Sequence, residues 1–361
     1  MEVNQKDILK HYLASVLVYG VVLLILFIMP VFNQNVANPY ISYLTVLLGY
    51  YVLYILVAYP ILNKFKPQSV LNSRNVLIVD YVKRQFRSVP LEEKLKNITP
   101  NDEEKQAFVI LFIKAFFGSY CLSLLCNKYL IHLGYDFGFL GAMWQQFIYY
   151  AQTSGVWAGF IQFIDDTADM WLTLMFTVIT VVYALSYLTE ADFLKNKIKY
   201  ADTSFLGVVS CIICYYPFTL LAEKIMPIAL KDLVPVENTP LRISLYFLVI
   251  IANFVIMLAV LRLGTKSGNL TNRGIVTGFP YNIVRHPEYS MRILYIILTV
   301  VPMYIIGKLS LFGNIILTIG MFMWIFIFVL RAITEERNLI KDEKYRNYTQ
   351  KVKWRFIPFV V

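Results

Sequence analysis

The feature that most constrains this 361-residue chain is a series of long apolar runs that recur along its length. A helix needs about 20 apolar residues to cross a hydrocarbon core roughly 30 Å thick, and several runs reach that length. Only 16% of the residues are charged, whereas soluble domains contain about 25%. The short alternating segments of a membrane barrel are absent from the sequence. The sequence therefore predicts an all-α, polytopic helical membrane protein.

About eight spans can be drawn, with boundaries uncertain by a few residues. Their expected limits are 12–30, 41–62, 107–130, 171–189, 204–222, 241–263, 289–306 and 309–330. If the N-terminus is cytoplasmic, most of the 33 Lys and Arg residues fall on the cytoplasmic side, where cationic loops are retained. The exceptions are Lys114, inside a span, and Lys128, Lys224, Lys231, Arg242 and Lys308, outside. We therefore expect both termini in the cytoplasm and no nucleic-acid partner, although the net charge is +10.

The segment 137–163 is apolar and aromatic but carries several Gln and Gly residues. A ninth span here would invert every later span and place the cationic C-terminus outside. We therefore predict a re-entrant or interfacial element on the outer face. Asp165, Asp166 and Asp169 follow it, and we interpret them as a solvated helix start rather than a metal site.

A cytoplasmic connector is expected over 63–106, and we interpret it as an amphipathic element on the anionic leaflet. Its end, Thr99-Pro100-Asn101-Asp102, predicts a helix start with Thr99 as the cap. The four cysteines lie in apolar runs, and Cys211 and Cys214 form a CxxC without a second pair or a nearby histidine. We expect packing roles for them and no metal site.

The stretch 281–289, YNIVRHPEY, stands immediately before the seventh expected span. The loop between the last two spans is very short, so these spans must form an antiparallel helical hairpin. The hairpin brings Tyr289 close to Arg331 at the end of the last span. Arg331 and Glu335 are four residues apart and share a helix face. Pro287 favours an extended residue before it, which places His286 on a turn at a helix start.

Each of these polar residues alone would fit a membrane anchor or a helix-end salt bridge. Their convergence from both ends of one hairpin instead favours a functional site. His11 and His132 lie near span ends, and we interpret both as interfacial.

Several short motifs follow one another between residues 277 and 358. They are Thr277-Gly278-Phe-Pro-Tyr281, Val284-Arg-His-Pro-Glu-Tyr289, Glu335-Glu-Arg-Asn-Leu339, Tyr345-Arg-Asn-Tyr348 and Arg355-Phe-Ile-Pro358. Arranged around a helical hairpin, they resemble the isoprenylcysteine carboxyl methyltransferase and phospholipid methyltransferase group of membrane enzymes. The resemblance covers about 253–358. It divides the chain into an N-terminal transmembrane region, 1–252, and a C-terminal methyltransferase-like core, 253–361.

The resemblance implies that the core binds S-adenosylmethionine without a Rossmann domain. The residues it implies for the cofactor cavity are Ile275, Val276, Tyr281, His286, Pro287, Tyr289 and Glu335. It also implies that Arg331 faces the methyl acceptor. We predict Arg331, Glu336 and Arg285 as the catalytic residues, with Glu336 as the candidate base for an amine acceptor. We expect an amphiphilic acceptor (a lipid, an isoprenoid or a lipidated molecule) that enters from the bilayer on the cytoplasmic side.

Two departures from the family pattern are Met291, where a Gly is usual, and Glu288, where many members have an apolar residue. A second interpretation is an NADPH-dependent membrane reductase of the sterol reductase type, which has a related terminal helical pattern. The Glu335-Glu336 pair favours methyl transfer over reduction. A third interpretation is a transporter, for which Lys114 and Asn253 are polar candidates within spans. The region 1–252 is expected to form a substrate-facing wall or a partner surface.

Overall fold

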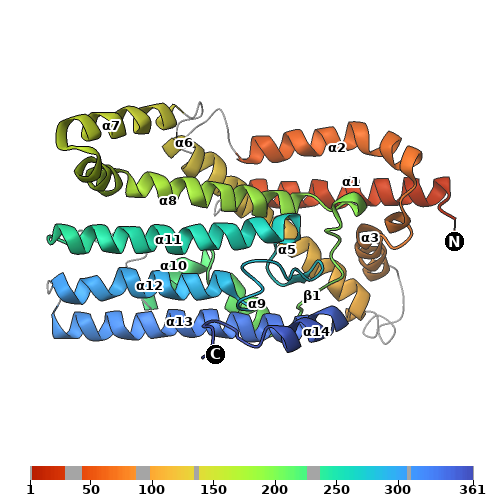
Figure 1. Ribbon diagram of the computed structural model, residues 1–361. Coiled ribbons are helices and arrows are strands. Elements are labelled where there is room, and N and C mark those ends of the chain that lie inside the picture. Colours follow the sequence, from red (N-terminus) through yellow and green to blue (C-terminus); the bar gives the residue numbers. More distant parts are fainter. Residues whose placement is uncertain are drawn as a thin grey trace. The chain divides into compact units, whose positions relative to one another are not determined.

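The computed structural model describes residues 2–28, 43–86, 98–133, 138–225, 236–306 and 310–360 (Figure 1). The chain forms two compact units, Met1–Asn127 and Lys128–Val361. Position 252/253, the expected boundary of the methyltransferase-like core, lies within helix α11 (Thr239–Leu263), and that division stays a prediction. The described secondary structure is helical apart from two short strands, so the all-α prediction is confirmed.

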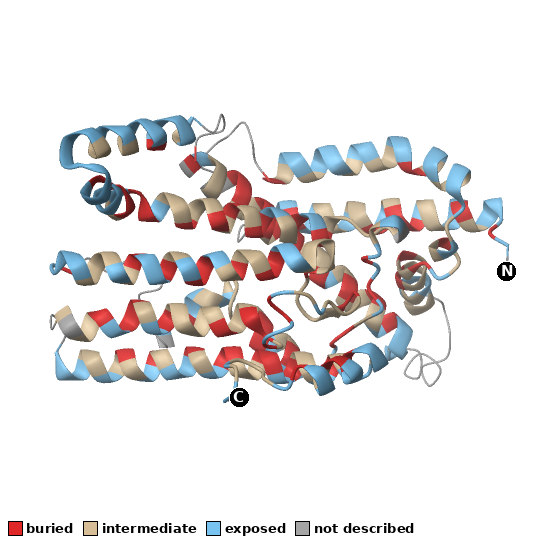
Figure 2. Cartoon of the chain, viewed as in Figure 1, coloured by how far each residue is buried: buried red, intermediate tan, exposed pale blue. Residues whose placement is uncertain are grey.

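Six of the described helices are long and apolar enough to cross a membrane. On α2, apolar side chains such as Leu53 and Leu56 are more than half exposed, and Figure 2 shows exposure along most of that helix. Exposed apolar helix surface on this scale suits a lipid environment. The chain is therefore an all-α membrane protein. The six helices are α1 (Gln5–Ile28), α2 (Tyr43–Phe65), α5 (Asp102–Leu124), α8 (Val156–Leu188), α11 and α13 (Leu311–Leu339).

Among the described residues, six helices are long and apolar enough to span a membrane, compared with the eight spans expected. The expected span 289–306 does form one helix, α12 (Pro287–Ile306), but it is not among the six. The expected span 204–222 is not a single helix. It consists of α9 (Phe205–Ile212) and α10 (Phe218–Ile225), separated by a turn that contains Pro217. Proline lacks the N–H that a continuous helix needs, which explains the break.

Helices α8 and α11 run in the same direction. Arg242 in the first turn of α11 places its Nη2 2.6 Å from Oδ2 of Asp165, which lies in the N-terminal third of α8. At the other end, Ser186 Oγ in the last turn of α8 donates at 3.1 Å to the carbonyl of Thr265, just beyond α11. The segment between the two helices, which includes α9 and α10, therefore returns the chain from one end of the bundle to the other (Figure 1).

The segment expected to be re-entrant forms α7 (Phe139–Ser154) and the first part of α8, joined at Gly155. The two helices pack against each other as an antiparallel pair. The expectation that Asp165, Asp166 and Asp169 begin a helix was wrong, because α8 starts at Val156. Arg242 pairs with Asp165 and the Tyr150 hydroxyl donates to Asp166, which makes these carboxylates tolerable inside the helix. The re-entrant or interfacial position of α7 on the outer face of the membrane stays a prediction.

In the first unit, the connector forms helix α3 (Arg74–Gln85), and residues 87–97 lie outside the described part. Helix α5 begins after Asn101, not after Thr99 as expected. The Asn101 side chain accepts from the Glu104 N–H at 2.8 Å, and Glu104 accepts from the Asn101 N–H at 2.9 Å. This reciprocal capping box satisfies two backbone donors and moves the cap two residues later.

In the second unit, α12 and α13 form the expected antiparallel hairpin (Figure 1). Ile296 and Val300 of α12 pack with Trp324 and Phe328 of α13. Helix α14 (Glu343–Lys351) follows, and the tail then returns to the start of α12, where the Arg285 and His286 N–H groups donate to the Trp354 and Arg355 carbonyls. Strands β1 (Tyr200–Ala201) and β2 (Thr271–Asn272) pair antiparallel at the same end. The remaining short elements are η2 (Gln68–Val70), η3 (Leu125–Tyr129), α6 (Leu130–Leu133), η4 (Asp192–Leu194) and η5 (Gly264–Lys266).

Candidate functional site

Two adjoining pockets open at the end of the second unit where the strands, α14 and the tail meet. The larger chamber has about 810 Å³ of space between its atoms, including the part open to solvent, and the smaller chamber has about 370 Å³. They share part of their walls, so a ligand in one would lie next to a ligand in the other. The shared residues are Gly268, Asn269, Thr271, Tyr289, Glu335 and Leu339.

All seven residues that the resemblance implied for a cofactor cavity line the larger chamber, and so does Arg285. They come from three separate stretches of chain, the loop at 275–276, the segment 281–289 and helix α13. Sequence reasoning assigned no role to several further wall residues. One of these, Tyr183 of α8, belongs to the N-terminal region, where no motif marked it. The others include Lys266, Arg273, Tyr345 and Tyr348.

The turn before α12 is fixed by hydrogen bonds to the first turn of α12 and to the C-terminal tail. Pro287 is the first residue of α12, and the buried His286 precedes it as the sequence predicted. Ser290 Oγ is 2.9 Å from the His286 carbonyl and 2.8 Å from the Phe356 carbonyl, so it ties the first turn of α12 to the tail. The His286 ring stacks on Tyr289, with ring centroids 5.4 Å apart. These contacts fix the direction in which the imidazole points.

Glu336 is surrounded by two arginines and a histidine. Arg285 Nε lies 2.7 Å from its Oε1, His286 Nε2 lies 3.1 Å from the same oxygen, and Arg355 Nε lies 2.9 Å from Oε2. Glu336 is not on the wall of either chamber. This placement favours a structural role, joining α13 to the turn and the tail, over the role of a base for an amine acceptor.

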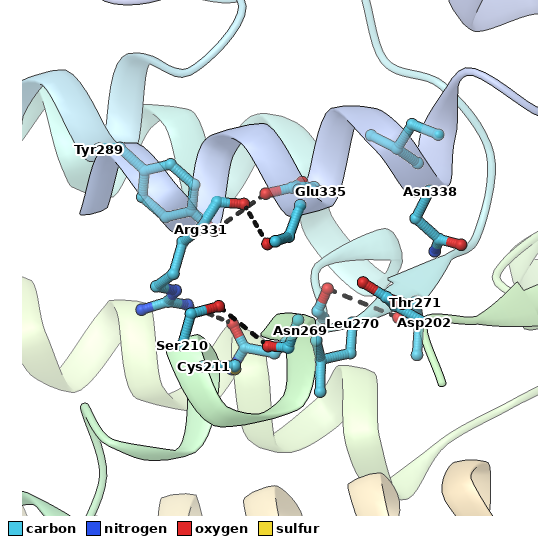
Figure 3. A pocket seen from close by; sticks show the side chains of 14 residues that line it. Asp202, Ser210, Cys211, Asn269, Leu270, Thr271, Tyr289, Arg331, Glu335 and Asn338 are labelled. Atoms are coloured by element: carbon cyan, nitrogen blue, oxygen red, sulfur yellow. Dashed lines mark hydrogen bonds between the residues drawn. The ribbon is translucent and has the colours of Figure 1, made fainter. Parts of the chain in front are cut away.

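Glu335 has a different environment, on the wall that the two chambers share. The Tyr289 hydroxyl donates to Glu335 Oε2 at 2.9 Å, and His286 Nδ1 is 4.0 Å from the same oxygen. The side chain is 43% exposed, so its carboxylate can accept further hydrogen bonds from a ligand. Figure 3 shows the hydrogen bond between Tyr289 and Glu335 beside Arg331.

Arg331 is a buried cation on the wall of the smaller chamber (Figure 3). Its Nη2 donates to Asn269 Oδ1 at 2.9 Å. The guanidinium carbon lies 5.1 Å from the Tyr289 ring centroid and 5.9 Å from that of Tyr215, so aromatic faces cover part of it. No carboxylate in the described part of the chain lies within ion-pair distance of Arg331.

The opposite side of the smaller chamber comes from the segment that follows β1. Asp202, Ser210 and Cys211 line it, and the resemblance does not cover any of them. The Asp202 N–H donates to the Leu270 carbonyl at 2.7 Å, which continues the pairing of the two strands. Sequence reasoning missed Asp202 because only this strand pairing, across about 70 residues of sequence, brings it to the site.

The acid at Glu288, a departure from the family pattern, is fully partnered. Arg292 Nη2 lies 2.8 Å from its Oε1, and the Tyr183 hydroxyl donates to its Oε2 at 2.9 Å. Both Glu288 and Tyr183 line the larger chamber. Helix α8 is thereby tied to the first turn of α12, and the N-terminal region contributes to the chamber wall.

Two tyrosines in the larger chamber remain neutral hydroxyls. Burial raises the pKa of Tyr281, and the nearby carboxylates of Glu288 and Glu335 raise it further. Burial likewise raises the pKa of Tyr345, with Glu336 adding to the effect. The Tyr345 hydroxyl has no hydrogen-bond partner among the described residues. It is therefore a hydrogen-bonding group that a ligand in the chamber could satisfy.

Comparison of the chain with protein-family models, curated proteins and solved structures found no match. Within the described residues, no group of three or more His, Cys, Asp or Glu side chains could hold a metal ion.

Proposed function

We propose that this chain is an integral membrane S-adenosylmethionine-dependent methyltransferase that acts on an amphiphilic acceptor. One observation carries the proposal. The seven residues implied for cofactor binding by resemblance to the isoprenylcysteine carboxyl and phospholipid methyltransferase group lie together on one chamber wall, although they come from three chain segments. Six of the seven lie within residues 275–289, and the fold brings Glu335 of α13 to the same wall.

The wall chemistry of the larger chamber suits this cofactor. S-adenosylmethionine combines a carboxylate with an ammonium and a sulfonium, and it carries a nucleoside with hydroxyl groups and an aromatic base. The chamber offers the cationic side chain of Lys266, the exposed carboxylate of Glu335 and tyrosine rings and hydroxyls.

The bound cofactor would supply an electrophilic methyl group. The residues of this chain would position the reactants, since an in-line displacement depends mainly on alignment. Glu335, oriented by Tyr289, stands between the chambers and would favour positive charge there. Arg331 would hold an anionic acceptor group in the smaller chamber, where burial strengthens its interaction with an anion.

We also propose eight crossings of the membrane, with both termini and the site on the cytoplasmic side. Six long apolar helices, α12, and the return through α9 and α10 would make up the eight. The parallel course of α8 and α11 supports that return. The excess of Lys and Arg on one side supports the orientation.

Calorimetric titration of the detergent-purified protein would test the proposal. We expect S-adenosylhomocysteine to bind and NADPH not to bind. Glu335→Gln should weaken S-adenosylhomocysteine binding roughly tenfold or more, because it removes a charged hydrogen-bond acceptor. The control is Glu343→Gln, an exposed acid of α14 outside both chambers, which should bind as the unchanged protein does. Binding of NADPH alone would indicate the reductase, and binding of neither would refute the proposal.

A further inference from the structure

Asp202 is a buried acid whose carboxylate is only half satisfied. Its side chain lines the smaller chamber, and the residue is 7% exposed. Oδ1 accepts from the Ser204 N–H at 2.9 Å. Oδ2 has no hydrogen-bond partner among the described residues, which also contain no ion-pair partner for this carboxylate. A buried carboxylate oxygen without a donor is costly, so a donor is expected when the chamber is filled.

Arg331 is a buried cation that lines the same smaller chamber. It is also 7% exposed, and its guanidinium has five N–H donors. The structure shows a side-chain hydrogen bond from one of its nitrogens, to Asn269, and contacts with aromatic rings. A buried cation without a counter-ion is costly for the same reason as a buried anion.

The two opposite charges do not neutralise each other, because they are not within ion-pair distance although both line one chamber. The loop at 268–271 holds them in place separately. Asn269 accepts from Arg331, and its own backbone N–H donates to the Tyr187 hydroxyl at 2.8 Å. The neighbouring Leu270 carbonyl accepts from the Asp202 N–H (Figure 3). The fold thus fixes an anion and a cation at separate positions on the wall of one pocket.

From this arrangement we infer that the smaller chamber binds a zwitterionic group, with Asp202 accepting from its ammonium and Arg331 donating to its carboxylate or phosphate. A ligand with both charges satisfies both side chains at once, whereas a purely anionic group leaves Asp202 unpaired. Asp202 is therefore a binding residue contributed by the N-terminal region, and it determines specificity for an ammonium group.

This inference rests on the proposed function in assigning the source of the zwitterion. The shared wall with Tyr289 and Glu335 places the group beside the larger chamber. It belongs either to the amino-acid end of the cofactor or to the head group of the acceptor. Both sources present the same ammonium and anion, and the experiment separates them.

The test is calorimetric titration of the full-length purified protein with two zwitterionic probes, S-adenosylhomocysteine and short-chain phosphatidylethanolamine. Each is compared with its N-acetylated form, which lacks the ammonium charge. The variant is Asp202→Asn. The matched control is Asp165→Asn, which also converts an acid to an amide in the second unit but lies near the opposite end of α8.

We expect Asp202→Asn to weaken binding of one zwitterionic probe roughly tenfold or more, and its N-acetylated form to bind equally weakly to both proteins. Asp165→Asn should bind as the unchanged protein does. Loss confined to S-adenosylhomocysteine assigns the zwitterion to the cofactor, and loss confined to the phospholipid assigns it to the acceptor. Unchanged binding of both probes by Asp202→Asn overturns the inference.

If Asp202→Asn does not fold, the affinities of the unchanged protein for the probes still test the inference. Equal affinity for each probe and its N-acetylated form overturns the inference, and a roughly tenfold preference for a free ammonium supports it. The proposed function fails separately, when S-adenosylhomocysteine does not bind at all. A phospholipid affinity that depends on Asp202 would in that case retain the zwitterion site without the methyltransferase.

Discussion

Glu335 and Glu336 are neighbours in the chain, yet they have different surroundings. Successive helix residues point about 100° apart, so only one of the two can face the chambers. The spacing of four from Arg331 correctly placed Glu335 on the same face, at the chamber wall. The partners of Glu336 could not be predicted, because Arg285 and His286 are about 50 residues away in sequence and Arg355 lies in the tail.

Replacing Glu336 by Gln should destabilise the protein far more than it alters the chamber walls. Arg285 and Arg355 would then lose the carboxylate that they share, and breaking the buried pair with Arg285 by itself costs about 3 kcal/mol or more. The apparent Tm of the purified protein should therefore fall by several degrees. Glu343→Gln, at an exposed site, should change it by little. Equal Tm values for the two variants would show that the Glu336 cluster is not structural.

At the scale of elements, the sequence located most helices but misjudged where some begin and end. Helix α8 starts at Val156, well before the expected residue 171, because a carboxylate at Asp165 is compensated by Arg242, 77 residues away. A hydropathy pattern does not contain that partner. The cap of α5 was displaced for a more local reason, since Asn101 and Glu104 cap each other more completely than Thr99 can.

The packing of α7 on α8 gives a prediction at this scale. A Cβ at Gly159 would lie 2.5 Å from the Tyr150 backbone carbon, so Gly159→Ala must push the two helices apart. Overpacking of this kind typically costs about 1–3 kcal/mol. Thermal unfolding and limited proteolysis near Gly155 should both show a weakened α7–α8 pair.

Gly141→Ala is the matched control, because Gly141 is in α7 and a Cβ there would meet nothing within 4 Å. Alanine is the better helix former by about 1 kcal/mol, so this variant should be at least as stable as the unchanged protein. If Gly159→Ala behaves in the same way, the close contact between α7 and α8 is wrong.

At the scale of the whole molecule, the proposed orientation rests on the distribution of Lys and Arg, and the proposed crossing pattern rests on the course of the helices. We expect epitope tags at the two termini to be accessible from the cytoplasmic side, and a tag inserted after Gly155 to be accessible from the opposite side. Antibody labelling of sealed and permeabilised membranes measures this directly. A Gly155 tag on the same side as the termini would contradict the proposed topology.

The sequence by itself determined the class of the protein, the positions of most membrane-length helices and the hairpin that carries YNIVRHPEY. These features depend on the transfer of apolar residues out of water and on turn chemistry within a few residues, which are local properties of a chain. Only the tertiary structure showed that α9 and α10 return the chain from one end of the bundle to the other. It also determined which residues pair with Glu336 and placed Tyr183 and Asp202 on the chamber walls. Those features depend on contacts between residues about 50 to 100 positions apart, such as Tyr183 with Glu288, and local patterns carry no information about such contacts.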